Sequence, residues 1–117
     1  MTLATSAQFL EKRTRRYAEV TIPTLGEVRL QSLSDAERTV IDLELHDEKG
    51  KRRPNKMAEY KGRLIAACVV NEEGQCIFTE GDAKMLIEMD AAVVNAIVDA
   101  INQRCGLDTD LETLAKN

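Results

Sequence analysis

The stretch at residues 20–38, VTIPTLGEVRLQSLSDAER, constrains the fold of this chain more than any other part of it. Polar and apolar residues alternate over residues 17–22 and again over 27–32, which is the period of half-buried strands. Between the two runs, Pro23 has its φ preset for a turn, and Gly26 can adopt a positive φ. The pattern therefore predicts a β-hairpin.

A helix start follows the hairpin directly. Ser34 and Glu37 have the spacing of a capping box, in which the serine side chain accepts from the backbone N–H of the glutamate and the glutamate side chain reaches back. Leu33 precedes the cap, at the position of a hydrophobic staple. We therefore expect the hairpin to lead into a helical body.

Apolar residues at helical spacing predict the rest of that body. The expected helices run from the Ser34 cap to about His46, over residues 56–70, from Thr79 onward, and over 91–104, with short helices after Thr5 and Thr109. The predicted fold class is α+β and mainly α-helical, with an N-terminal β-hairpin packed on a bundle of about four to five helices.

The chain of 117 residues is long enough for one domain and too short for two. We expect a short N-terminal helix or arm over residues 1–16, the hairpin over 17–32 and the helical body over 34–116. Within the body, residues 47–55 are polar and interrupted by glycine and proline, which predicts a flexible basic loop.

Composition and charge narrow the function classes. A net charge of −4 argues against binding of nucleic acid or an anionic membrane by the whole domain. No apolar run approaches the roughly 20 residues that a membrane-spanning helix needs. The basic residues near the N-terminus follow its mildly apolar part, the reverse of a secretory signal. The sequence thus predicts a soluble, cytoplasmic protein.

Residues for catalysis or metal binding do not assemble into a motif. The three cysteines and His46 lack the paired spacing of a zinc site or a disulfide framework. The sequence contains no GxSxG, HExxH, Walker or GxGxxG motif. We therefore predict a non-enzymatic binding protein without a metal or cofactor.

Methionine and aliphatic residues are the first candidates for partner binding. Met57, Met85, Leu86 and Met89 are adaptable apolar groups, and a tolerant binder of an apolar helix would use such groups. The alternative is that they fill the core, since an apolar stripe at helical spacing usually does so.

Basic residues are the second candidates. Lys51, Arg52 and Arg53 belong to the most basic cluster, residues 49–56, and can steer an acidic partner or simply form a solvated loop. The same cluster underlies an alternative function, a small nucleic-acid-binding regulator, against which the net negative charge and the scarcity of aromatic residues count. For the arginines at 13, 15 and 16 the two interpretations are a solvated strand start and an anion-binding site.

Several short motifs, taken in order, resemble the tail assembly chaperones of long-tailed phages and prophages. They are GEVRL at 26–30, SLSDAER at 32–38, RLIAACVV at 63–70, NEEG at 71–74, FTEGD at 78–82, and GL at 106–107 followed by an acidic segment. The resemblance covers residues 17–117. Many members of that family carry a tryptophan in the hairpin turn, where this chain has Leu25.

The resemblance implies a non-catalytic role in the cytoplasm of the host bacterium. Such chaperones bind the long hydrophobic tape measure protein, keep it soluble, help to recruit tail tube subunits and leave before the tail is finished. The resemblance also implies a homo-oligomer. In many phages, a frameshift adds a longer form with an extended C-terminus, which contacts the tube protein.

Overall fold

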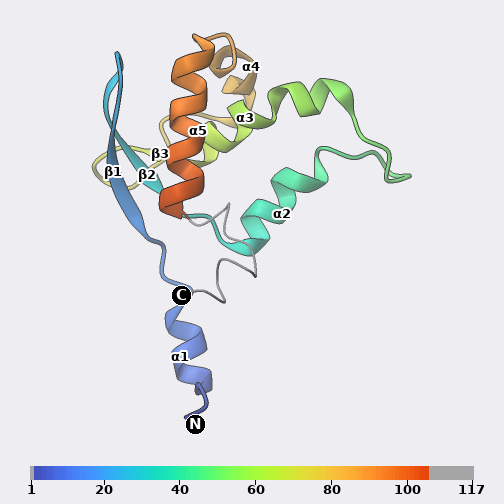
Figure 1. Ribbon diagram of the computed structural model, residues 1–117. Coiled ribbons are helices and arrows are strands. Elements are labelled where there is room, and N and C mark those ends of the chain that lie inside the picture. The colour runs from blue at the N-terminus through green and yellow to red at the C-terminus, as the bar shows by residue number, and fades with distance from the viewer. Residues whose placement is uncertain (1, 106–117) are drawn as a thin grey trace.

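The computed structural model describes residues 2–105 and consists of a small sheet beside a helical body, with a helical arm that projects from it (Figure 1). The elements in chain order are α1 (Ser6–Glu11), β1 (Tyr17–Ile22), β2 (Gly26–Gln31), α2 (Asp35–Leu43), α3 (Pro54–Cys68), β3 (Val69–Val70), the 3-10 turn η1 (Glu80–Asp82), α4 (Ala83–Leu86) and α5 (Ala91–Cys105). The predicted fold class, α+β and mainly helical with an N-terminal hairpin, is confirmed.

The hairpin forms where its turn chemistry predicts. β1 pairs antiparallel with β2, with Val20 opposite Val28 and Ile22 opposite Gly26. The turn needs positive φ at two positions: Gly26 at 116°, where glycine has no Cβ penalty, and Thr24 at 68°, which is uncommon for a β-branched residue. The N–H of Leu25 donates to the Ile22 carbonyl at 3.1 Å and closes the turn.

A third strand adds to the sheet, and its pairing with β2 was not predicted. Val69 and Val70 leave α3 with extended backbone and pair with Leu30 and Arg29 of β2. The sequence predicted a helix that continues to residue 70, because valine suits the apolar helix face and a strand equally well. Val69 and Val70 are extended because they pair with β2, a strand from much earlier in the chain.

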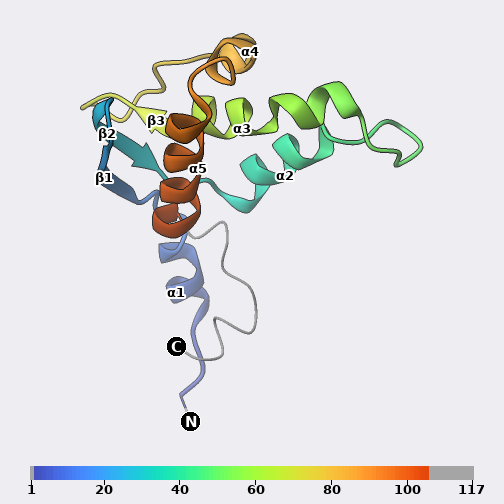
Figure 2. The same cartoon turned by 45° about the horizontal axis from the view of Figure 1, so that its top comes forward.

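The core lies between the sheet, α3 and α5. Leu30 from β2, Ile65 and Cys68 from α3 and Ile101 from α5 have their side chains almost completely removed from water. Helix α5 runs beside the hairpin in both views (Figure 1, Figure 2). Among the described residues, no helix is long and apolar enough to cross a membrane.

Two helical predictions were wrong in their extent. Helix α2 ends at Leu43 rather than near His46. The helix expected after Thr79 is divided into η1 and the single turn of α4, which ends in short-range hydrogen bonds from Glu88 to Met85 and from Met89 to Leu86. The helix expected after Thr109 lies outside the described residues.

Helices α3 and α4 approach each other at a glycine. A Cβ atom added to Gly62 would overlap the carbonyl oxygen of Ala83 and lie only 2.9 Å from its carbonyl carbon. Because the neighbouring atoms are backbone, they cannot move aside without shifting α4. Gly62 therefore sets the distance between the two helices.

We expect Gly62→Ala to lower the free energy of unfolding by about 1–3 kcal/mol, the usual range for overpacking. Urea unfolding followed by circular dichroism measures this change. Gly81→Ala is the matched control, because the nearest atom to a Cβ there is 3.7 Å away, the hydroxyl oxygen of Thr79. Equal stability of the two variants would contradict the proposed close contact.

Candidate functional site

An apolar groove of about 270 Å³ opens between the hairpin turn, the loop after β3 and helices α4 and α5. We call it the apolar groove; its lining residues are Leu25, Glu27, Val28, Arg29, Ile65, Val69, Val70, Ile77, Phe78, Leu86, Met89 and Ile97. Ile65, Leu86 and Ile97 are buried and belong to the core as well. Leu25 and Ile77 are 52% and 53% exposed, so they are open to a partner.

The hairpin turn places Leu25 at one side of the groove. The positive φ of Thr24 and Gly26 on either side of Leu25 reverses the chain tightly. At the tip of the turn, about half of Leu25 stays exposed to solvent. Leu25 is therefore available to contact another molecule.

The loop of residues 71–78 is fastened to the outer face of the sheet. Arg29 donates from Nη1 to the Glu72 carbonyl at 2.9 Å, and its guanidinium lies 4.7 Å from the centre of the Tyr17 ring. Gln31 donates from Nε2 to the Cys76 Sγ at 3.4 Å. These contacts hold the chain that leads to Ile77 and Phe78.

The structure separates the four apolar candidates into two pairs. Leu86 and Met89 line the apolar groove, whereas Met57 and Met85 are exposed outside its lining. Met85 and Met89 do not share a helix face, because α4 ends at Leu86.

The basic loop lies between α2 and α3, at the opposite side of the molecule from the hairpin (Figure 1). Asp47 organises it: its Oδ1 accepts from the N–H groups of Lys49 and Lys51, both at 2.9 Å. The backbones of Arg52 and His46 form an isolated antiparallel β-bridge, and the Arg53 N–H donates to the Leu45 carbonyl at 2.7 Å. Lys51, Arg52 and Arg53 thus lie together, but they do not belong to the apolar groove.

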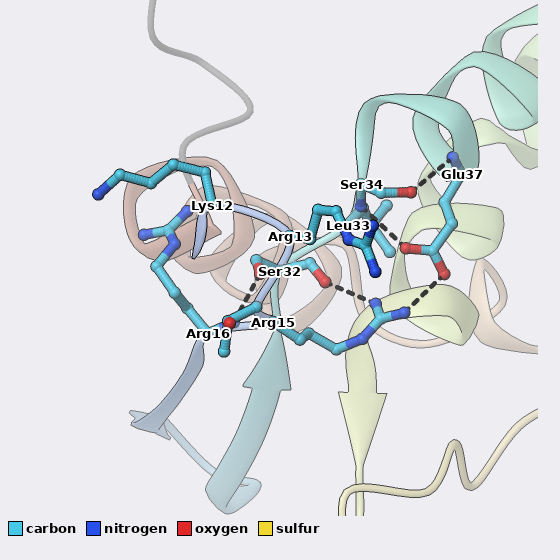
Figure 3. A pocket seen from close by; sticks show the side chains of 9 residues that line it. Lys12, Arg13, Arg15, Arg16, Ser32, Leu33, Ser34 and Glu37 are labelled. Atoms are coloured by element: carbon cyan, nitrogen blue, oxygen red, sulfur yellow. Dashed lines mark hydrogen bonds and ion pairs between the residues drawn. The ribbon is translucent and has the colours of Figure 1, made fainter. Parts of the chain in front are cut away.

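A second concave surface lies where the hairpin strands meet α1 and α2. This basic pocket has a volume of about 180 Å³, and its lining residues are Lys12, Arg13, Thr14, Arg15, Arg16, Ser32, Leu33, Ser34 and Glu37 (Figure 3). Arg15 points to Glu37, whereas Lys12 and Arg16 extend away from it (Figure 3).

Hydrogen bonds fix the shape of the basic pocket. Arg15 donates to the Ser32 carbonyl at 2.7 Å and to Glu37 Oε2 at 2.9 Å. The other carboxylate oxygen of Glu37 accepts from the Ser34 N–H at 2.8 Å, which completes the predicted capping box. Residues 12–16 are therefore tied to the start of α2.

The ion pair between Arg15 and Glu37 shifts the pKa of both side chains. The hydrogen bond and charge of Arg15 lower the pKa of Glu37, and Glu37 in turn raises the pKa of Arg15. Arg63 lowers the pKa of Glu44 in the same way, through two hydrogen bonds of 2.8 and 2.9 Å. Each pair joins elements that are distant in sequence.

No group of three or more metal-ligating side chains occurs within residues 2–105. Cys68 is buried, and Cys76 is exposed beside Gln31.

Sequence reasoning missed most of the groove. Leu25 belongs to the hairpin turn, and Ile77 and Phe78 belong to the loop after β3. The pairing of β2 with β3 brings these two loops together. The available signal was an apolar residue inside a turn and an apolar pair after the Gly74 turn, where polar residues are usual.

Comparison with known proteins gives a likeness in structure. No family model matches the sequence, and no curated protein matches it. Among solved structures, the chain is similar to the tail assembly chaperone of bacteriophage HK97, with a TM-score of 0.54 and 14% sequence identity. The similarity covers 75% of this chain and 84% of that chain. The fold of a phage tail assembly chaperone, which the sequence resemblance implied, is thereby confirmed.

We expect the Arg15–Glu37 pair to make stability depend on pH. A lowered pKa in the folded state means that the contribution is complete above the ordinary value of 4.5 and is lost as pH falls through the folded pKa. The side chains are 34% and 41% exposed, so at neutral pH Glu37→Gln lowers the free energy of unfolding by only about 1 kcal/mol or less.

Urea unfolding between neutral pH and about pH 3 measures this effect. The difference in the free energy of unfolding between the Glu37→Gln variant and the parent protein should decrease as the pH falls below the ordinary pKa of a glutamate. Glutamine keeps the capping hydrogen bonds and removes the charge. Glu73→Gln, at an exposed carboxylate without an ion pair among the described residues, is the control. An unchanged difference over the whole pH range would refute the assignment.

Proposed function

We propose that this chain is a tail assembly chaperone of a long-tailed phage or prophage, which binds the tape measure protein and keeps it soluble. In this role it acts without catalysis, in the cytoplasm of the host bacterium. It helps to recruit tail tube subunits and does not remain in the finished tail. The observation that carries the proposal is the fold shared with the HK97 tail assembly chaperone over 75% of the chain.

The apolar groove supports this function, and we propose it as the surface that binds the client. A long hydrophobic helical protein presents rows of apolar side chains, and a groove accepts such a row at helical spacing. Leu25, Ile77 and the adaptable Met89 provide apolar contact without a fixed polar geometry. A surface of this kind tolerates many successive segments of one client.

Further partners follow from the same role. We propose contact with the tail tube protein, through a longer frameshifted form of the chain, and association with further copies of the chain. In the described part, β1 pairs only with β2, so its outer edge has backbone N–H and C=O groups that another strand can pair with. This edge supports self-association.

Replacing Leu25 and Ile77 with glutamate tests the groove. Because both side chains are half exposed, we expect the variant to fold normally and to lose the client. Charged groups in an apolar contact weaken binding by roughly tenfold or more. Coexpression with the tape measure protein of the same phage or prophage, followed by measurement of the soluble fraction, gives the result.

Val40→Glu/Leu43→Glu is the matched control, since these residues are exposed aliphatic side chains on α2. The control variant should keep the client as soluble as the parent protein does. Full solubility with the Leu25→Glu/Ile77→Glu variant would exclude the groove. Failure of the parent protein itself to bind or solubilise the client would exclude the chaperone function.

The basic loop supports a second part of the proposal, the attraction of an acidic partner. We expect Lys51→Glu/Arg52→Glu to slow association with the tape measure protein by roughly tenfold at low salt, with the difference disappearing at high salt. Arg53 stays unchanged because it is the N-cap residue of α3, where a new side chain can alter the start of the helix.

Stopped-flow mixing across a range of salt concentrations measures the rate. Lys61→Glu/Lys84→Glu makes the same charge change at exposed positions outside the basic loop and serves as the control. Equal rates for all three proteins would show that the loop does not steer the client. Binding of duplex DNA by the parent protein, lost in the loop variant, would instead support the nucleic-acid-binding alternative.

A further inference from the structure

The N-terminal arm leaves apolar side chains in water. Helix α1 has no buried residue, and Leu3, Phe9 and Leu10 are 77%, 70% and 59% exposed. Its six residues are too few for a helix that is stable on its own in water, even with the Thr5–Gln8 capping box. The arm therefore needs a partner that packs against it.

The arm continues into the basic pocket. Lys12 lines both the cleft along the arm, with Leu3 and Phe9, and the basic pocket. Lys12 and Arg13 form no ion pair within residues 2–105, whereas Arg15 is already paired with Glu37. An apolar strip and a positively charged strip thus adjoin each other on one surface, which fits a partner that is both apolar and acidic.

The end of α5 lies beside this surface. Arg16 donates from Nη1 to the Arg104 carbonyl at 3.3 Å, across 88 positions of sequence. The described end of α5 therefore lies next to Arg16, which lines the basic pocket. An extended chain spans about 3.3 Å per residue, so the twelve residues 106–117 are together long enough to reach along the arm.

Residues 106–117, GLDTDLETLAKN, have the complementary chemistry. Leu107, Leu111 and Leu114 have the spacing of one helix face, and Asp108, Asp110 and Glu112 supply three carboxylates against one lysine. Because the segment is covalently attached, its effective concentration near the pocket is of the order of millimolar. A weak interaction is enough to keep it bound.

We propose that residues 106–117 dock on the arm of the same molecule, with their leucines against Leu3, Phe9 and Leu10 and their carboxylates against Lys12 and Arg13. The docked segment covers the apolar side of α1 and neutralises the unpaired cations of the basic pocket. This inference does not depend on the proposed chaperone function, because it uses only contacts within one chain.

A tryptophan in place of Phe9 tests the proposal, since the chain has no other tryptophan. In full-length Phe9→Trp protein, we expect an emission spectrum shifted to shorter wavelength relative to a tryptophan in water. Reversing the tail charges with Asp108→Lys/Asp110→Lys/Glu112→Lys should lower the docking constant by roughly tenfold and move the emission to longer wavelength. Adding Lys12→Glu/Arg13→Glu to the reversed tail should restore the original spectrum.

Glu48→Lys/Glu73→Lys/Glu88→Lys is the control, because it makes the same charge change at exposed positions outside the basic pocket. This control should leave the emission unchanged. A water-like spectrum of the introduced tryptophan in the full chain, or no response to the reversed tail, would overturn the proposal. An emission that depends on protein concentration would also overturn it, since a second copy would then cover the arm.

Discussion

The pairing of β2 with β3 connects the two halves of this protein. β2 is the middle strand, and the side chain of Leu30 near its end is completely buried. Through the pairs Leu30–Val69 and Arg29–Val70, the N-terminal hairpin is joined to the two residues that directly follow the core helix α3. Because α3 also packs against α4 across Gly62, this one pairing determines where the hairpin turn lies relative to α4. The apolar groove exists only as a consequence of that placement.

The parts of the fold that the sequence predicted are those governed by short-range rules. The hairpin follows from alternation and from a turn with Pro23 and Gly26, and the start of α2 follows from the Ser34–Glu37 capping box. β3 and the groove could not be predicted in this way. Two valines at a helix end suit either conformation, and the choice depends on a partner strand that is distant in sequence. For the same reason, the sequence could not show that Leu86 would line the groove while Met85 would lie outside it.

The two candidate surfaces differ in what they contribute to binding. In the proposed complex, the apolar groove would remove nonpolar area from water and thus contribute to the lifetime of the complex. The basic loop is exposed and has its own hydrogen bonds around Asp47, so its charges act mainly on the rate of encounter. The hairpin, whose turn borders the groove, and the basic loop lie at opposite sides of the body (Figure 1), and a partner that uses both must therefore be long.

A protein that binds an apolar client must expose apolar groups without aggregating. In this chain Leu25 and Ile77 are half exposed, but they belong to separate loops and lie over a groove rather than along a strand edge. Separation of this kind keeps each exposed patch small, whereas a continuous apolar strand edge would pair with other copies. The arm is the exception, because Leu3, Phe9 and Leu10 lie close together on one short segment. A chain with such an arm gains solubility if an acidic segment of its own covers it, since the cover then requires no second molecule.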